Sequence, residues 1–462
     1  MRPPKPTPRP DKVSLWRYMA LFKQDILSAQ PARLYRAWMA EFRTPFFRSF
    51  MVNQPDLVKH VLADADGHYP KSDRIKEGLL PLLGNSVFVT NGEVWKHQRR
   101  IIDPAFEGGR LRSVFPAMLD AGHAAVARMR DLAGTGPVEI ESVTSHAAAD
   151  VIFRTLFSIP ITDDVAAEVF SEFRNYQRTQ PILNLAAFVP LPRWLPRFFA
   201  PRTRQTAKTI RTLIAQLTNQ RLQAIRDGTA PDDLATKIMT TKDPRDGTVF
   251  DAQEMVDQVA IFFLAGHETS ASALGWALYL LAMTPQWQDR IAAEGKAQLN
   301  DKNIEFSAVS NLKLTRDVFR EALRLYPPVP MMVRENTCPK QFRDRTVPKK
   351  SQIVISPWHL HRHERLWDDP DDFNPARFQT DNGKKCMREA YIPFSAGARV
   401  CPGAGFAMIE GPLLLAILVR DFRFELVKDR PAVPVAHLTV RGKDGIWLRV
   451  TPRGGTRPEH TA

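Results

Sequence analysis

The chain has 462 residues, of which 44% are hydrophobic and 25% are charged, a balance typical of a globular protein whose core can bury a flat organic cofactor. Its formal net charge of +14 favours acidic partners, but no zinc-finger spacing or basic run of the nuclear-localisation type supports nucleic acid. The three cysteines, Cys338, Cys386 and Cys401, are too few and too scattered for a disulfide framework or a cysteine-rich zinc site, so we expect a reducing, cytoplasmic environment.

The two ends of the chain differ from the body between them. Residues 1–10 contain five prolines and predict an extended, flexible segment, and residues 453–462 predict a frayed, flexible tail. No apolar signal-peptide core follows the N-terminus, and no run of about 18 apolar residues predicts a transmembrane span. Residues 15–27 are amphipathic; we favour a helix packed on the body, with peripheral membrane contact as the alternative. Residues 11–452 contain no linker or repeat and predict a single domain.

The body is expected to be mostly helical. Apolar residues recur at intervals of three and four, the spacing of amphipathic helices, over residues 55–64, 92–102, 115–132, 202–227 and 311–326. Short strand-like segments lie near residues 46–53, 329–335, 352–357 and 437–449. These patterns predict a mainly α fold with a minor β region.

One predicted helix is much longer than the others. Asp251 and Glu254 form a start signal of the capping-box type, and Pro285 supplies the stop. At 1.5 Å per residue the helix would run about 50 Å, and its long apolar face places it at the centre of the molecule. Its middle reads Ala265-Gly266-His267-Glu268-Thr269. Because Gly costs about 1 kcal/mol against Ala inside a helix, we expect something to approach the backbone at Gly266.

The strongest local signal is a turn that delivers a cysteine to the start of a helix, Phe394-Ser395-Ala396-Gly397-Ala398-Arg399-Val400-Cys401-Pro402-Gly403. Pro402 suits a first helical position, where the helix dipole and free amide groups favour a thiolate at Cys401. Gly397 and Gly403 allow the backbone to turn tightly and to lie close to a flat ligand.

This stretch resembles the Phe-x-x-Gly-x-Arg-x-Cys-x-Gly signature of the cytochrome P-450 family, and Phe394, Gly397, Arg399, Cys401 and Gly403 match its fixed positions. The resemblance implies the fold of that family, with a long central helix over the haem, in a soluble, bacterial-type member. It also implies that the cofactor is haem b (iron protoporphyrin IX), bound by these residues, with Cys401 as the protein ligand to the iron.

Further motifs of the family follow in the same order along about residues 40–450. Glu321 and Arg324 match its Glu-x-x-Arg, whose spacing lets the two side chains pair on one helix face. Arg377, in Pro375-Ala376-Arg377-Phe378, matches the arginine that joins this pair, although the family usually has Glu at the position of Ala376. The resemblance implies a structural role for these three charged residues, which would hold the loop that presents Cys401.

The two propionates of a haem need cationic or hydrogen-bonding partners when they are buried. Trp95 and Arg99 match the Trp-x-x-x-Arg helix of the family, and Arg399 belongs to the cysteine signature. Arg334 stands where many relatives carry a propionate-binding Arg or His. The resemblance implies that these four residues bind the propionates, although Arg334 could instead be a solvated strand residue.

The middle of the long helix resembles the oxygen-side motif of the family. Thr269 would hydrogen-bond oxygen on the iron and Glu268 would supply protons, so these are the expected catalytic residues. The alternative for Thr269 is a hydrogen bond back to its own helix. By the same resemblance, residues 71–91 cover an apolar substrate pocket, which is lined by Phe262, Phe263, Ala265, Val329, Met331, Met332 and Val333.

Two other patterns concern histidines and basic residues. His359, His361 and His363 alternate, so a strand would present three imidazoles on one face; we favour a surface segment common in the family over a second metal site. Two basic groups are placed by the resemblance near the Cys401 face, where redox partners dock, unless they are only solvated. They are Lys96, Arg99, Arg100, Arg110 and Arg112, and Lys384, Lys385 and Arg388.

These features predict a haem-thiolate monooxygenase that hydroxylates an apolar small organic substrate with dioxygen. No Gly-x-Gly-x-x-Gly fingerprint follows a predicted strand, so electrons would come from a separate ferredoxin, flavodoxin or flavoprotein reductase. Two alternatives stay open. A peroxygenase or isomerase of the same fold would usually replace the pair Glu268 and Thr269, and a non-enzymatic haem sensor would carry a second protein ligand on the oxygen side.

Overall fold

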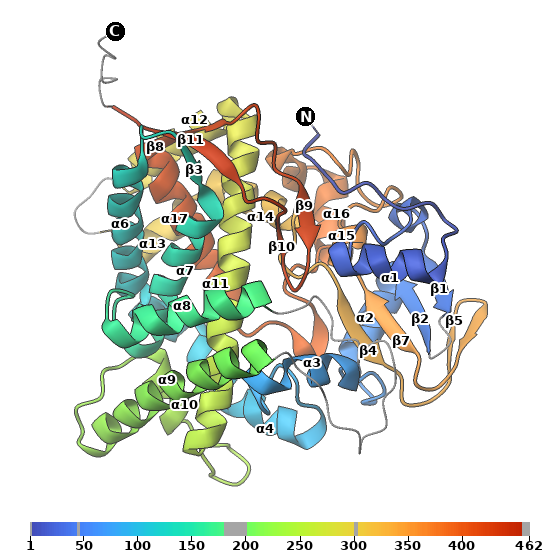
Figure 1. The fold of residues 1–462 in the computed structure, drawn as a ribbon, viewed down its shortest axis with the longest axis horizontal. Helices are drawn as coiled ribbons and strands as arrows, with labels where there is room; N and C mark the ends of the chain where they lie inside the picture. Colours follow the sequence, from blue (N-terminus) through green and yellow to red (C-terminus); the bar gives the residue numbers. More distant parts are fainter. Residues whose placement is uncertain (1, 44–46, 180–200, 300–303, 455–462) are drawn as a thin grey trace.

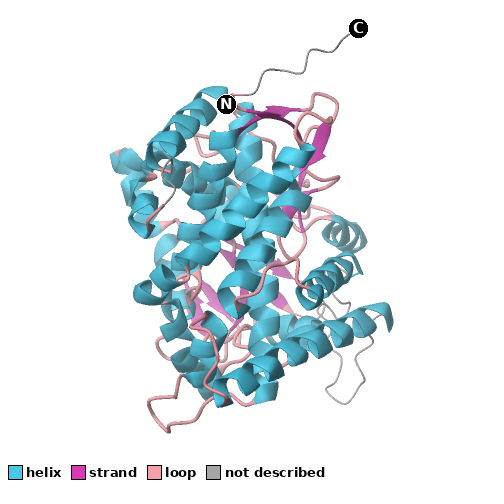
Figure 2. Ribbon diagram, turned by 90° about the vertical axis from the view of Figure 1, so that its left-hand side faces the viewer, coloured by secondary structure: helices cyan, strands magenta, loops and turns pink. Residues whose placement is uncertain are grey.

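The computed structural model describes residues 2–43, 47–179, 201–299 and 304–454, in which helices predominate and strands are short (Figures 1 and 2). The helices are α1 (Leu15–Gln24), α2 (Pro55–Ala63), α3 (Asp73–Leu83), α4 (Gly92–Ile102), α5 (Gly108–Ser113), α6 (Phe115–Leu132), α7 (Ile140–Phe157), α8 (Asp164–Thr179), α9 (Pro201–Arg226), α10 (Leu234–Thr240), α11 (Ala252–Met283), α12 (Pro285–Gln298), α13 (Phe306–Asn311), α14 (Lys313–Leu325), α15 (Pro357–Leu360), α16 (Asp381–Glu389) and α17 (Ala404–Asp421). The strands are β1 (Met39–Arg43), β2 (Arg48–Val52), β3 (Pro137–Glu139), β4 (Met332–Glu335), β5 (Lys340–Phe342), β6 (Arg345–Val347), β7 (Gln352–Ile355), β8 (Phe422–Leu426), β9 (Pro434–Ala436), β10 (Val440–Gly442) and β11 (Trp447–Pro452). The mainly α fold with a minor β region is confirmed.

The long central helix is confirmed as α11, which has 32 residues and crosses the whole molecule (yellow in Figure 1). Its predicted capping box is present: the Asp251 side chain accepts from the backbone of Glu254, whose carboxylate accepts from the backbone N–H of Asp251. The helix ends at Met283, just before Pro285 begins α12. It packs against α7, α9 and α17, so its apolar side chains are buried around most of its circumference.

Gly266 in the middle of α11 is explained by a neighbouring helix. A Cβ atom at this position would lie 2.5 Å from Cδ1 and 2.9 Å from Cγ1 of Ile152 on α7. Something does approach the backbone here, as predicted, and it is a core side chain. Gly266 therefore serves the close packing of α7 on α11.

Four strands form a sheet beside the helical body, in the order β1-β2-β7-β4 (right-hand side of Figure 1). β1 and β2 form an antiparallel hairpin, β2 pairs with β7 in parallel, and β4 pairs with β7 antiparallel. Strands were predicted near 46–53, 329–335 and 352–357, and each contains a shorter observed strand. The predicted strand over 437–449 is wrong as a single element, because it splits into β10 and β11, which belong to different sheets.

Most predicted helices agree with the structure to within one or two residues. The segment 71–91 has more structure than the sequence indicated, since it contains α3 with Leu79, Leu82 and Leu83 buried. Its two ends are joined to each other: Asn91 accepts from the Lys71 backbone N–H at 2.9 Å and donates to the Lys71 carbonyl at 3.1 Å. The segment is therefore held as a closed loop rather than an open lid.

The N-terminal segment lies along the body. The Arg9 backbone N–H donates to the Gln30 carbonyl at 3.2 Å, and the Tyr326 hydroxyl donates to the Pro4 carbonyl at 2.7 Å. Residues 2–10 are extended, as expected, but these contacts are not those of a free, flexible segment.

Of the predicted C-terminal tail, residues 455–462 lie outside the described part of the chain. The helix predicted within 15–27 is confirmed as α1, and its Trp16 is 82% exposed.

None of the helices in the described ranges has the length and apolarity needed to span a bilayer.

Candidate functional site

Cys401 ends a tight turn between the irregular segment after α16 and the start of α17. The Cys401 backbone N–H donates to the Phe394 carbonyl at 2.9 Å and closes this turn. Gly397 has a φ of +66°, and a Cβ there would lie 2.2 Å from the Leu62 carbonyl oxygen of α2, so no other residue fits. Pro402 was predicted to be the first residue of the helix. This prediction is wrong, because α17 begins at Ala404 and Pro402 lies in the turn before it.

The Cys401 thiol is both accessible and closely surrounded by protein. Its side chain is exposed, yet desolvation by the surrounding protein raises the pKa of the thiol. A hydrogen bond from the Gly403 N–H and the positive charges of Arg99 and Lys71 act on that pKa in the opposite direction. A Cβ at Gly403 would meet only the sulfur within 4 Å, at 3.8 Å, so no other side chain crowds the thiol at this position.

The three charged residues of the predicted triad meet in one buried network. Arg324 donates to both Glu321 carboxylate oxygens at 2.8 Å, and Arg377 donates to Glu321 at 2.9 Å. The remaining guanidinium N–H groups donate to backbone carbonyls, which for Arg324 belong to His361, Pro370 and Asp372. The triad thereby fixes the segment 361–377, and Ala376, where the family usually has Glu, is not part of the network.

The three alternating histidines are buried, so the expected surface segment is wrong. His359 hydrogen-bonds Ser356 at 2.8 Å, His361 accepts from the Ile392 backbone at 2.9 Å, and His363 stacks on the Trp38 ring. They lie in helix α15 and in the turns after it rather than in a strand. Among the described residues, the one group of side chains that could hold a metal ion lies elsewhere and includes none of the three. Burial lowers the pKa of His359 and of His361 to about 3 and that of His363 to about 4.

Four cationic side chains gather near Cys401, and one of them, Lys71, was missed by the sequence analysis. Burial lowers the pKa of Lys71 well below its usual value, and the charges of Arg399, Arg334 and Arg99 lower it further. Arg334 is 5% exposed, so it is not the solvated residue that was the alternative. Within the described ranges, neither Lys71, Arg334 nor Arg399 forms an ion pair with a carboxylate. Of the four cations, Arg99 alone has an ion pair among the described residues, to Asp103 at 2.7 Å.

Trp95 and Arg399 lie together at the edge of this cationic group. The Arg399 guanidinium lies over the Trp95 ring, 4.2 Å from its centroid, and donates to the Thr90 carbonyl and to Asn91 Oδ1. Arg99 donates to the Val400 carbonyl at 2.7 Å, next to the cysteine. The residues predicted for propionate binding, Trp95, Arg99, Arg334 and Arg399, are thus brought together with Lys71.

This arrangement fits a haem. Buried cations without carboxylate partners are costly, and two propionates would supply the missing negative charge. The accessible thiol of Cys401 lies beside them, and a thiol that binds a metal ion loses its proton. A lone buried cysteine would require neither the accessible thiol nor the surrounding charges.

On α11, Glu268 and Thr269 face different surroundings. The Glu268 carboxylate pairs with Arg441 on β10 and accepts from the Thr439 hydroxyl at 2.8 Å. Its Oε2 is buried and has no hydrogen-bond partner in the part of the chain that the structure describes. The Thr269 hydroxyl donates to the Ala265 carbonyl at 2.6 Å, the ordinary bond of a threonine inside a helix. Arg441 and Thr439 were missed, because nothing in the sequence indicates which part of the 437–449 segment meets α11.

A cavity of about 1070 Å³ lies between α11, the four-stranded sheet and α1. Ala265, Val329, Met331 and Val333 line it, as predicted, and Thr269, predicted as a catalytic residue, lines it as well. Strand alternation explains why Met332 does not, since it points to the opposite side of β4, into a separate core cluster.

Two predicted pocket residues lie elsewhere. Phe263 packs against Phe153 and Phe173 in the core, and Phe262 packs edge-on against Phe106. Both predictions were wrong, because the turn of α11 that points Ala265 into the cavity points these two rings away from it. From the closed loop 71–91, Ser72, Ile75, Leu79 and Phe88 do reach the cavity, so its expected position at the pocket is confirmed.

A second, polar cavity of about 280 Å³ adjoins the first. Glu141, Gln177, Glu268 and Arg441 line both cavities, so the Glu268–Arg441 pair stands in the wall between them. Burial raises the pKa of Glu141 to about 7, although the Gly442 N–H donates to it.

The predicted basic groups are partly neutralised by carboxylates. Arg100 donates twice to Asp243, and Arg110 pairs with Asp232. The cations that stay exposed are Arg112, Lys384, Lys385 and Arg388, together with Lys96, which pairs with Glu93 at the surface. Val400, the neighbour of Cys401, is 38% exposed, so the surface of the protein reaches the residue next to the thiol.

Comparison with known proteins gives a consistent answer. The cytochrome P450 family model matches residues 32–446. A cytokinin hydroxylase of Arabidopsis thaliana is 29% identical over 435 residues, covering 90% of this chain and 83% of that protein. Cytochrome P450 4A11 of Homo sapiens is 31% identical over 417 residues (86% and 78%), and a cyclooctat-9-en-7-ol 5-monooxygenase of Streptomyces melanosporofaciens is 30% identical over 426 residues (90% and 87%).

The fold and the cationic site thus define a haem protein of mainly α architecture. The chain belongs to the cytochrome P450 family. It is a P450-type monooxygenase, and its cofactor is haem b.

Proposed function

We propose that this enzyme hydroxylates an apolar small organic substrate at a haem that is ligated by Cys401. The observation that carries the proposal is the accessible Cys401 thiol beside three buried or half-buried cations that have no carboxylate partner within the described residues. The haem supplies the iron that activates dioxygen. Lys71, Arg99, Arg334 and Arg399 would hold its propionates, and Trp95 would add its indole N–H.

The residues of α11 would control protons on the cavity side. Thr269 lines the large cavity and can exchange its bond to the Ala265 carbonyl for one to a ligand. Glu268 stands in the wall between the apolar and the polar cavity, so it can receive a proton from the polar side and pass it toward Thr269. Arg441 would keep Glu268 in this wall as a positioning residue.

Electrons would come from a separate ferredoxin, flavodoxin or flavoprotein reductase that docks where Val400 is exposed. Arg112, Lys384, Lys385 and Arg388 are exposed and would be available to an acidic partner. A cytoplasmic location is supported by the three cysteines, all of which are free. The exposed Trp16 of α1 favours peripheral membrane contact through this helix.

The experiment is a labelled turnover of the haem-loaded protein with a surrogate ferredoxin and reductase, NADPH and an apolar substrate under ¹⁸O₂. We expect one labelled oxygen atom in the product and none when dioxygen is absent. Product formed only with added peroxide would identify a peroxygenase, and a rearranged product without labelled oxygen would identify an isomerase. Reduction without any product from a diverse apolar library would favour a sensor.

A further inference from the structure

The mouth of the large cavity is strongly cationic, in contrast to its apolar interior. The side chains that line it near α1, the β1–β2 hairpin and α3 include two carboxylates, Asp11 and Glu41. Five cations line the same part: Arg9, Lys12, Arg33, Arg43 and Arg74. A purely apolar substrate would gain nothing from this excess of positive charge.

Two of these cations are paired with neighbouring carboxylates. Arg43 donates twice to Glu41, at 2.7 and 3.3 Å. Arg33 lies 3.7 Å from Asp11, and both side chains are largely exposed. Pairs of this kind exist without a ligand and contribute little to binding.

Arg9 differs from them, because it is 9% exposed and still has unused donors. Its Nε donates to the Ala29 carbonyl at 2.6 Å, and its Nη1 donates to the carbonyls of Pro10 and Asp11 at 2.7 and 2.9 Å. A guanidinium has five N–H donors, so the two on Nη2 remain. Nη2 meets no acceptor within the described ranges, and no carboxylate pairs with Arg9 there. Burial lowers the pKa of Arg9, as expected for a charge that lacks a full counter-charge.

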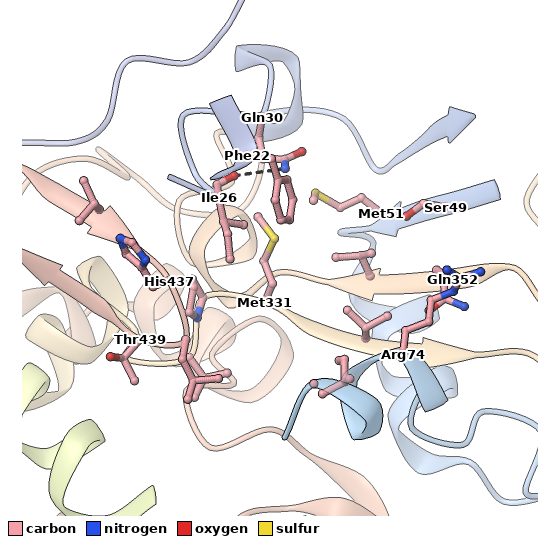
Figure 3. A pocket seen from close by; sticks show the side chains of 18 of the residues that line it. Phe22, Ile26, Gln30, Ser49, Met51, Arg74, Met331, Gln352, His437 and Thr439 are labelled. Carbon is pink, nitrogen blue, oxygen red and sulfur yellow. Dashed lines mark hydrogen bonds between the residues drawn. The ribbon is translucent and has the colours of Figure 1, made fainter. Parts of the chain in front are cut away.

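An apolar path leads from Arg9 into the cavity. Arg9 is joined through its backbone to Gln30, and from there Phe22, Ile26 and Met331 point into the cavity side by side (Figure 3). Met51 and Val354 line the sheet side, and the path ends at Ala265 and Thr269 on α11. Arg74, Ser49 and Gln352 form a separate polar corner on the opposite side (Figure 3).

We propose that the Arg9 guanidinium binds the carboxylate of an elongated apolar acid, whose hydrocarbon chain lies along Phe22, Ile26 and Met331 toward Thr269. This inference rests on the proposed function and narrows its substrate class from any apolar molecule to long-chain carboxylic acids. A charge-assisted hydrogen bond to a buried guanidinium selects an acid against its neutral analogues. Because Arg9 lines the cavity beside α1 and Thr269 lines it on α11, the reaction would fall on the hydrocarbon chain rather than beside the acid group.

The test is an optical and calorimetric titration of the haem-loaded protein with dodecanoate, dodecanol and methyl dodecanoate at neutral pH. We expect dodecanoate to bind at least about 10-fold more tightly than either neutral ligand. Arg9→Gln should remove this preference and leave the affinity for dodecanol unchanged, whereas Arg9→Lys should keep part of it. Arg43→Gln is the matched control, because Arg43 lies at the same mouth but is already paired with Glu41.

Several outcomes would overturn the inference while leaving the proposed function intact. They are equal affinity for the three ligands, an acid preference that Arg9→Gln retains, and an acid preference that Arg74→Gln removes instead. If Arg9→Gln weakens binding to phosphatidylglycerol vesicles but not to dodecanoate, the cation belongs to a membrane contact. By contrast, failure of the protein to take up haem, or to give product from any ligand, would contradict the proposed function itself. A melting temperature equal to that of the wild type shows that the Arg9 variants are folded.

Discussion

The Cys401 side and the cavity side of α11 are organised differently. On the Cys401 side, Glu321, Arg324 and Arg377 are buried, and each of their charges has several partners. On the cavity side, counting only described residues, Glu268 has a buried oxygen without a hydrogen-bond partner and Arg9 has N–H donors without an acceptor. A fully bonded network holds one arrangement of the chain, while incompletely bonded groups are available to a ligand or a proton. We infer that the Cys401 side holds the cofactor in place, and that the cavity side selects the substrate and controls protons.

The largest expected effect comes from breaking the buried network. Arg324→Ala would leave Glu321 buried with one cation and would free the carbonyls of His361, Pro370 and Asp372. Removing one partner of a buried pair costs about 3–5 kcal/mol, so we expect mostly insoluble or haem-free protein. The measurement is the yield of folded protein and its haem content.

Arg320→Ala is the control for this change, since Arg320 pairs with Asp317 on the same helix but is partly exposed. It should behave like the wild type. Normal haem content and stability in Arg324→Ala would show that the network does not hold the Cys401 side.

The buried histidines sharpen the comparison through pH. The pKa of His361 is about 3 in the folded protein against about 6.5 in an unfolded chain, so between these values the unfolded chain binds a proton that the folded one does not. The free energy of unfolding should therefore fall as the pH is lowered below about 6.5. Each such histidine contributes about 1.4 kcal/mol per pH unit.

Replacing one histidine should remove its share of that slope. Gln can still accept from the Ile392 N–H, so His361→Gln should flatten the dependence of urea unfolding on pH between about 5.5 and 4.5. His123→Gln changes an exposed histidine and should leave the slope unaltered. Equal slopes for the wild type and His361→Gln would contradict the buried neutral state.

The smallest effect on stability, with a clear effect on chemistry, is expected on the cavity side. Thr269→Ala removes one bond to the Ala265 carbonyl and should leave the melting temperature nearly unchanged. It should raise the peroxide released per NADPH consumed several-fold, because a proton donor is lost at the cavity. Thr212→Ala is the matched control, since Thr212 makes the same bond to its own helix on the surface of α9. If Thr269→Ala releases no more peroxide per NADPH than the wild type, Thr269 does not belong to the proton path.

The sequence analysis succeeded where local patterns determine the structure. The capping box of Asp251 and Glu254, the turn at Gly397 and the pairing of Glu321 with Arg324 all depend on residues close in the chain. It also grouped Arg99, Arg334 and Arg399 correctly, but only through the resemblance. The helix in 71–91 escaped it, because Gly78 and Pro81 weaken the helical pattern there.

The failures concern the direction in which side chains point. Phe262 and Phe263 were assigned to the pocket, although the rotation of α11 is fixed by its packing on α7. Met332 was assigned there because the register of β4 could not be read from a run of apolar residues. Lys71 and Arg441 were missed for the same reason: Arg334 and Arg399, which act on Lys71, and Glu268, which pairs with Arg441, are all more than a hundred residues away in the chain.

The central claim is that the Cys401 thiolate binds the haem iron, and the reduced carbon monoxide spectrum of the haem-loaded protein tests it most directly. The account predicts a red-shifted Soret band that is characteristic of thiolate ligation, and its complete loss in Cys401→His, while Cys386→Ser, at a buried cysteine away from the site, keeps it. An unshifted band in the wild type, or a red-shifted band that survives in Cys401→His, would contradict the account.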